Sequence, residues 1–109
     1  MPTSPQLAMI EEEIQRRFLP SNPITEAIAN RLSRTLFQQR RCESLLEFAR
    51  SIPEGKLAAL PLSKQTSFQQ TTRKLVEKIK DLKRSSREYS AALSAQTKSP
   101  SNPAQITAE

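Results

Sequence analysis

Histidine is absent from the sequence, and its 109 residues include one cysteine and one glycine. Without histidine the chain lacks the usual general base and the commonest metal ligand. A single cysteine excludes an intramolecular disulfide and a cluster of thiolate metal ligands, and a reducing, cytoplasmic location is the simplest fit. One glycine is too few for a P-loop or a dinucleotide-binding loop. We therefore expect no enzymatic activity, no metal and no cofactor.

Aromatic residues and long apolar runs are also scarce. Aromatics make up 5% of the chain and hydrophobic residues 36%, which suits a lean core of packed helices. The longest apolar run, residues 57–62, is interrupted by Pro61, so we expect no membrane-spanning segment. Glu11, Glu12 and Glu13 stand where an export signal would carry basic and then apolar residues, so we expect no such signal.

The clearest pattern that is present is an unbroken heptad within residues 66–95. Residues that are apolar or small and polar recur at spacings that alternate between four and three, which predicts a helix that packs along one seam. Thr66 followed by Gln69 fits a capping box at the start of this helix. The seam consists of Phe68, Thr72, Leu75, Ile79, Leu82, Ser86, Tyr89 and Leu93.

A short helix is predicted at residues 5–19, where Ser4 is a good N-cap and Pro5 a good first residue. Its apolar stripe recurs at helical spacing. Two prolines, Pro20 and Pro23, then break the helix, because each disfavours helical geometry in the residue before it. The stripe consists of Leu7, Ile10, Ile14 and Phe18.

A long helix is predicted at residues 23–51, with Asn22 as its N-cap. Leu45, Phe48 and Ile52 widen its apolar face near the end, which predicts that this part contacts two neighbours. Thr35 and Gln39 interrupt the stripe with polar side chains. The stripe itself consists of Ile24, Ile28, Leu32, Leu36, Cys42, Leu46 and Ala49.

These elements predict an all-α fold with one domain at residues 1–95. One short helix accompanies two long antiparallel helices in a coiled-coil-like hairpin. In the linker at residues 52–65, Leu57, Leu60 and Leu62 are expected to plug the end of the bundle. Residues 96–109, rich in proline, serine and threonine, are expected to form a disordered tail.

Positive charge is concentrated in the last predicted helix. The formal net charge is +6, and residues 64–109 contain nine basic and four acidic side chains. Such an asymmetry indicates an anionic partner, with a solvated helix surface as the alternative. Four of these side chains recur at intervals of three, one and three on one side of the seam, and two more precede them. The six are Lys80, Lys83, Arg84, Arg87, Arg73 and Lys74.

Three arginines of the long helix at residues 23–51 form a secondary candidate set. Arg31, Arg34 and Arg41 lie beside the apolar stripe, whereas Arg40 points away from them. They suit phosphate binding, but ion pairing with Glu43, Glu47 and the acids of the first helix is the favoured interpretation.

No catalytic residue is assigned. Glu11, Glu12 and Glu13 are the one cluster of carboxylates, and neighbouring residues on a helix point in different directions. Cys42 lacks a histidine partner and falls on an apolar stripe, which favours a core position. Tyr89 lies on the seam and is also interpreted as a core residue.

Residues 17–43 carry one resemblance to known proteins. The segment Arg17-Phe18-Leu19-Pro20-Ser21-Asn22-Pro23-Ile24-Thr25-Glu26 is followed by the Ile28, Leu32, Leu36 stripe and by Arg40-Arg41-Cys42-Glu43. It resembles a helical segment of bacterial proteins, some of them similar to phage terminase small subunits. That resemblance implies DNA handling in mobile elements.

Two functions of different kinds follow. The preferred hypothesis is a small basic accessory subunit that binds a nucleic-acid backbone with little sequence preference, because few aromatics are present to stack on bases. The alternative is an interaction module that docks on a second copy or on another protein through the seam. Binding to a membrane surface is less favoured, since the helix carries no tryptophan and one phenylalanine.

Overall fold

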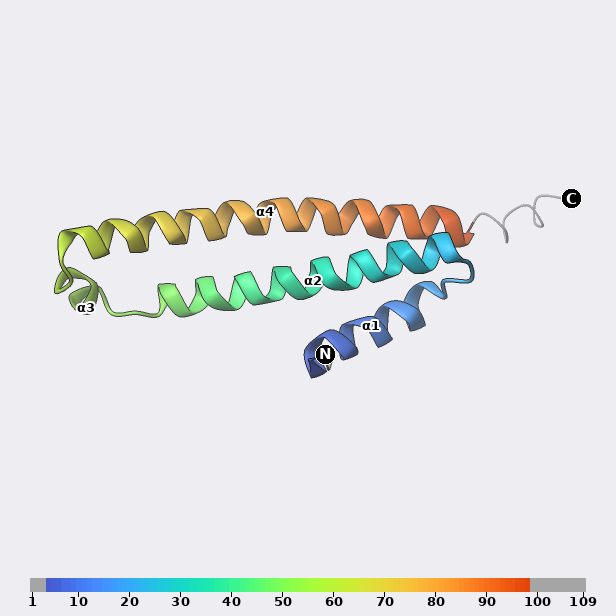
Figure 1. Cartoon of the computed structure of the whole chain (residues 1–109), viewed down its shortest axis with the longest axis horizontal. Helices are drawn as coiled ribbons and strands as arrows, with labels where there is room; N and C mark the ends of the chain where they lie inside the picture. Colours follow the sequence, from blue (N-terminus) through green and yellow to red (C-terminus); the bar gives the residue numbers. More distant parts are fainter. Residues whose placement is uncertain (1–3, 99–109) are drawn as a thin grey trace, which may run out of the picture.

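A computed structural model describes residues 4–98 of the chain and the side chains of residues 4–96. Within that range the fold is all-α, with helices α1 (Pro5–Phe18), α2 (Pro23–Arg50), α3 (Glu54–Ala58) and α4 (Leu62–Lys98). The long helices α2 and α4 lie side by side and antiparallel, and α1 lies along the N-terminal half of α2 (Figure 1). The predicted fold class is confirmed, and the structure adds the five-residue α3 within the predicted linker.

The α1 helix forms as its sequence pattern predicts. Its first turn is capped by Ser4, whose Oγ accepts a hydrogen bond from the Leu7 amide at 3.1 Å. Ile10 and Ile14 are buried, and the other two stripe residues are half-buried. The helix ends at Leu19, which adopts a left-handed conformation with φ of 48° and donates its N–H to the Gln15 carbonyl at 3.0 Å.

The start of α2 differs from the predicted stripe. Thr25 is buried, whereas Ile24 is exposed. The capping box explains the difference, because Asn22 Oδ1 accepts from the Thr25 amide at 2.9 Å while Thr25 Oγ1 accepts from the Asn22 amide at 3.1 Å. This pairing turns Thr25 inward, and the small residues Ala29 and Ser33 are buried after it at helical spacing.

The core consists of two apolar clusters arranged along the hairpin. In the first, Ile10 and Ile14 of α1 pack with Ala29, Leu32 and Leu93. In the second, Cys42 and Leu46 of α2 pack with Ile79 of α4, and α1 does not take part. The half of the hairpin near α3 therefore has two helical layers where the other half has three.

The predicted seam of α4 is confirmed as the surface that faces its own α2. All eight of its residues are buried or half-buried. Its polar members are satisfied, since Ser86 Oγ donates to Gln39 Oε1 at 3.3 Å and Thr72 Oγ1 donates to the Phe68 carbonyl at 2.9 Å. Gln39, which was predicted to interrupt the apolar stripe of α2, thus pairs with Ser86, a polar residue of the α4 seam.

The start of α4 and the linker were predicted incorrectly in two respects. The helix begins at Leu62, four residues before Thr66, so the predicted capping box is not used. Instead the Pro61 carbonyl accepts from the Lys64 and Gln65 amides, and Gln65 Nε2 donates to the Leu60 carbonyl at 2.8 Å. Leu60 and Leu62 are exposed and do not plug the bundle, whereas Leu57 is half-buried.

The far end of α4 also extends beyond its predicted limit. The helix continues to Lys98, three residues past the predicted end of the domain at residue 95. The remainder of the predicted disordered tail, residues 99–109, lies outside the described residues. In the part of the chain that is described, no helix combines the length and the apolar character that crossing a membrane requires.

Truncation of Leu93 tests the three-helix cluster. Leu93 is 0% exposed, and we expect Leu93→Ala to lower the free energy of unfolding by about 2–5 kcal/mol because it leaves a cavity. Leu62→Ala is the matched control, since Leu62 is 77% exposed and we expect a change below about 0.5 kcal/mol. Urea denaturation followed by circular dichroism measures both, and equal losses would contradict the described core.

The left-handed residue at the end of α1 gives a second test. Leu19 is exposed, so its side chain contributes little packing, and a left-handed conformation is unfavourable for any residue with a Cβ atom. We expect Leu19→Gly to raise the free energy of unfolding by about 0.5–1 kcal/mol and Leu19→Val to lower it. Thermal denaturation of the two variants should shift in opposite directions, and shifts of the same sign would refute the assigned conformation.

Candidate nucleic-acid interface

The exposed side of α4 carries a row of basic side chains. Successive residues of an α-helix are turned by about 100° around its axis. Going around the circumference of α4 from the seam, Lys83 and Arg87 come first, and Lys80, Arg73 and Arg84 lie farther from the seam. No acidic side chain falls within this sector. We call these five residues the basic face of α4: Arg73, Lys80, Lys83, Arg84 and Arg87.

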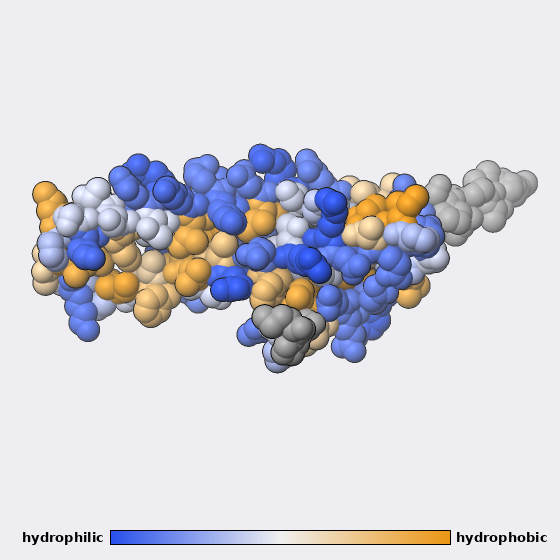
Figure 2. Space-filling view, in the orientation of Figure 1, coloured by the Kyte–Doolittle hydropathy of each residue, from blue (hydrophilic) through white to orange (hydrophobic). Residues whose placement is uncertain are grey.

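The basic face is accessible along its whole length. All five residues are exposed, and the middle stretch of the outer edge of α4 is hydrophilic in the space-filling view (Figure 2). From Arg73 to Arg87 the axis of α4 advances by about 21 Å. The helix α4 therefore presents five exposed cations within a sector of about 100° of its surface.

Three of the five cations have acidic neighbours. Lys80 pairs with Glu77 at 3.7 Å and Arg84 with Asp81 at 3.0 Å, both within one turn of α4. Lys83 approaches Glu43 of α2 at 3.9 Å. Every side chain in these pairs is at least 41% exposed, and such surface pairs contribute little to stability. A phosphate group can therefore compete for these cations at small cost.

Lys74 does not belong to the basic face, although it was predicted with it. An acidic row formed by Glu77, Asp81 and Glu88 separates the two on the helix surface. Lys74 lines a shallow hollow together with Lys78, Glu77 and Asp81, and Arg73 of the basic face lies at the edge of the same hollow. Its surroundings have mixed charge, which makes it a weaker candidate for phosphate.

The arginines of α2 lie apart from the basic face as well. Leu32 and Gln39 face α4. Arg34 comes two positions after Leu32, and Arg41 two positions after Gln39, so both arginines point about 200° away from α4 around the axis of α2. The favoured expectation of ion pairing was wrong for the side chains that the structure describes, because none of the three arginines lies in an ion pair there and Glu43 pairs with Lys83. Arg41 places its guanidinium 5.8 Å from the centre of the Phe37 ring, and Arg31 and Arg34 are exposed.

The seam that was considered as a partner site is occupied within the chain. Ile79 packs against Cys42 and Leu46, with Leu75 and Leu82 beside them. At the other end of the seam, Leu93 packs with the α1 residues and Tyr89 lies beside that cluster. Phe68 is half-buried near the α3 end of the hairpin. A docking partner would have to displace α2 to reach Ile79, and α1 as well to reach Leu93.

Sequence reasoning missed one exposed surface, where the start of α1 meets the middle of α2. Met9, Phe37, Arg40 and Leu45 come together there around a groove of about 550 Å³. The sequence feature that could have indicated this surface is the widened apolar face in the second half of α2. That face was predicted to contact two neighbouring elements, but the described residues provide only one, and Leu45 and Phe48 are exposed. No group of three metal-binding side chains occurs within the described part of the chain.

The chain matches no protein-family model, no curated protein and no solved structure in the three comparisons made.

The ion pairs on α4 provide a test of how freely its cations are held. We expect Glu77→Gln and Asp81→Asn each to change the free energy of unfolding by less than about 0.5 kcal/mol, because both pairs are exposed. Urea denaturation at low and high salt measures the change. A loss above about 1 kcal/mol for either variant would show that the basic face is held in structural ion pairs rather than available to a ligand.

Proposed function

We propose that this protein is a non-enzymatic accessory subunit that binds the phosphate backbone of a nucleic acid with little sequence preference. The observation that carries the proposal is the basic face of α4, with five exposed cations within a sector of about 100° on the helix and no acidic residue inside that sector. Backbone contacts of this kind neutralise phosphates and release counterions, which supplies sequence-independent affinity.

The composition of the basic face supports weak sequence preference. Both aromatic residues of α4, Phe68 and Tyr89, lie on the seam and are half-buried, so the basic face itself offers no ring on which a base could stack. Arginine and lysine side chains on a straight helix fit phosphate oxygens without reading base edges. Residues 17–43 also resemble a helical segment of bacterial proteins, some of them similar to phage terminase small subunits, which is in keeping with a DNA-related role.

The alternative function, docking of a protein partner through the seam, is less well supported. The seam packs on α2, so its use would require the hairpin to open.

We propose a reducing, cytoplasmic location, on the ground that the chain carries a single cysteine, Cys42, which is buried.

A salt series on a labelled nucleic-acid duplex tests the proposed function. If four or five cations meet phosphates, the logarithm of the affinity should fall with the logarithm of salt concentration at a slope of about −4. The variant Lys80→Ala, Lys83→Ala, Arg84→Ala, Arg87→Ala should bind weakly at low salt, with a slope close to zero. Fluorescence anisotropy measures both quantities, and circular dichroism verifies that the variant is folded.

A second quadruple variant separates position from total charge. Arg31→Ala, Arg34→Ala, Lys74→Ala, Lys78→Ala removes the same number of positive charges from outside the basic face. We expect it to retain most of the affinity and a slope near that of the wild type, because long-range attraction alone is screened by salt. Equal losses in the two variants, or no loss in the first, would refute binding through α4. Single-stranded and duplex DNA and RNA complete the series.

A further inference from the structure

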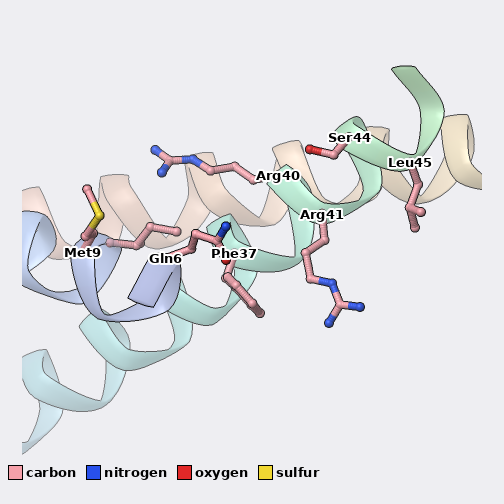
Figure 3. A pocket seen from close by; sticks show the side chains of 8 residues that line it. Gln6, Met9, Phe37, Arg40, Arg41, Ser44 and Leu45 are labelled. Atoms are coloured by element: carbon pink, nitrogen blue, oxygen red, sulfur yellow. The ribbon is translucent and has the colours of Figure 1, made fainter. Parts of the chain in front are cut away.

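The groove between α1 and α2 is a second exposed surface, separate from the basic face. Its walls come from Met9 on α1 and from Phe37, Arg40, Arg41 and Leu45 on α2, and its volume is about 550 Å³. In Figure 3, Phe37, Arg41 and Leu45 project from one side of α2. Phe48 follows Leu45 by three positions and extends the same side by one turn.

The groove exists because α1 is half the length of α2. The helices have 14 and 28 residues, so α2 continues beyond the start of α1 without a third helix against it. Met9, Leu45 and Phe48 are 69%, 53% and 68% exposed, although the sequence pattern of α2 had predicted a second neighbour for this region. Neighbouring large apolar side chains that remain exposed are characteristic of docking surfaces.

The charge of the groove identifies the kind of partner. Among the residues that the structure describes, Arg40 and Arg41 are the charged ones that line the groove, and no carboxylate does. Arg40 also borders a neighbouring hollow that Glu12 and Glu13 line, whereas Arg41 does not. Neither arginine forms an ion pair with any of the described side chains. Arg41 lies over the Phe37 ring, where it remains free to donate to an approaching carboxylate. An apolar depression beside two such arginines is complementary to apolar side chains flanked by acids.

We propose that this groove binds an acidic amphipathic helix of a partner protein. Apolar side chains at i and i+4 of that helix would contact Met9, Phe37 and Leu45, and its carboxylates would pair with Arg40 and Arg41. A second copy of this chain fits less well, because a two-fold interface would bring the same pair of arginines together from both protomers. The proposal does not depend on nucleic-acid binding by α4.

Selection from a display library of helical peptides tests the proposal. The full chain is the bait, and the variant Leu45→Ser, Phe48→Ser is used for counter-selection, since both residues are exposed and their replacement should leave the fold intact. We expect the recovered peptides to be acidic and to carry apolar residues at i and i+4. Their dissociation constants should rise about tenfold or more for the variants Leu45→Ser, Phe48→Ser and Arg40→Gln, Arg41→Gln.

Matched variants control for general attraction to a basic protein. Ile24→Ser removes an exposed apolar residue elsewhere on α2, and Arg31→Gln, Arg34→Gln removes two charges elsewhere; both should leave peptide binding unchanged. The quadruple alanine variant of the basic face should also retain it. Recovery of neutral or basic peptides, or no recovery, would overturn the proposal. So would a dimer in sedimentation that Leu45→Ser, Phe48→Ser dissociates, because the occupant would then be a second copy.

Discussion

The hydrogen bond between Ser86 and Gln39 crosses the middle of the contact between α2 and α4, with an apolar cluster on either side. Sliding α4 along α2 by one helical turn would separate the two side chains and leave each beside apolar neighbours, where an unpaired polar group is costly. The pair thus favours one alignment of two helices whose leucines and isoleucines alone would tolerate several. Gln39 also donates to Glu43, which in turn lies near Lys83, so the polar contacts extend from the interior to the surface.

That alignment determines where the remaining parts of the molecule lie. It brings Leu93 beside Ala29 and Leu32, and the small side chain of Ala29 leaves room for Ile10 and Ile14 of α1. The same alignment directs the seam of α4 inward along its length. The basic face consequently remains outside and is separate from the groove, which lies on the opposite side of α2.

Local patterns were sufficient to predict much of this arrangement. Heptad spacing identified all eight seam residues of α4, because one helical period determines which side chains share a surface. The same periodicity placed Lys80, Lys83, Arg84 and Arg87 together. Lys74 was included with them although the same periodicity places it beyond an acidic row, and the position of the α2 arginines relative to α4 depends on how the two helices are rotated against each other. The burial of Thr25 in place of Ile24 was likewise set by hydrogen bonds of the cap rather than by hydrophobicity.

How far the start of α1 reaches along α2 could not be read from the sequence of α2, and so the exposure of Leu45 and Phe48 was not foreseen. Cys42 lies in the same half of the hairpin but on its inner side, buried against Ile79. As the one thiol of the sequence, it can react with an alkylating reagent only when α2 and α4 separate. The rate of its modification therefore reports how often the two-helix half of the molecule opens, and the native chain needs no added label for that measurement.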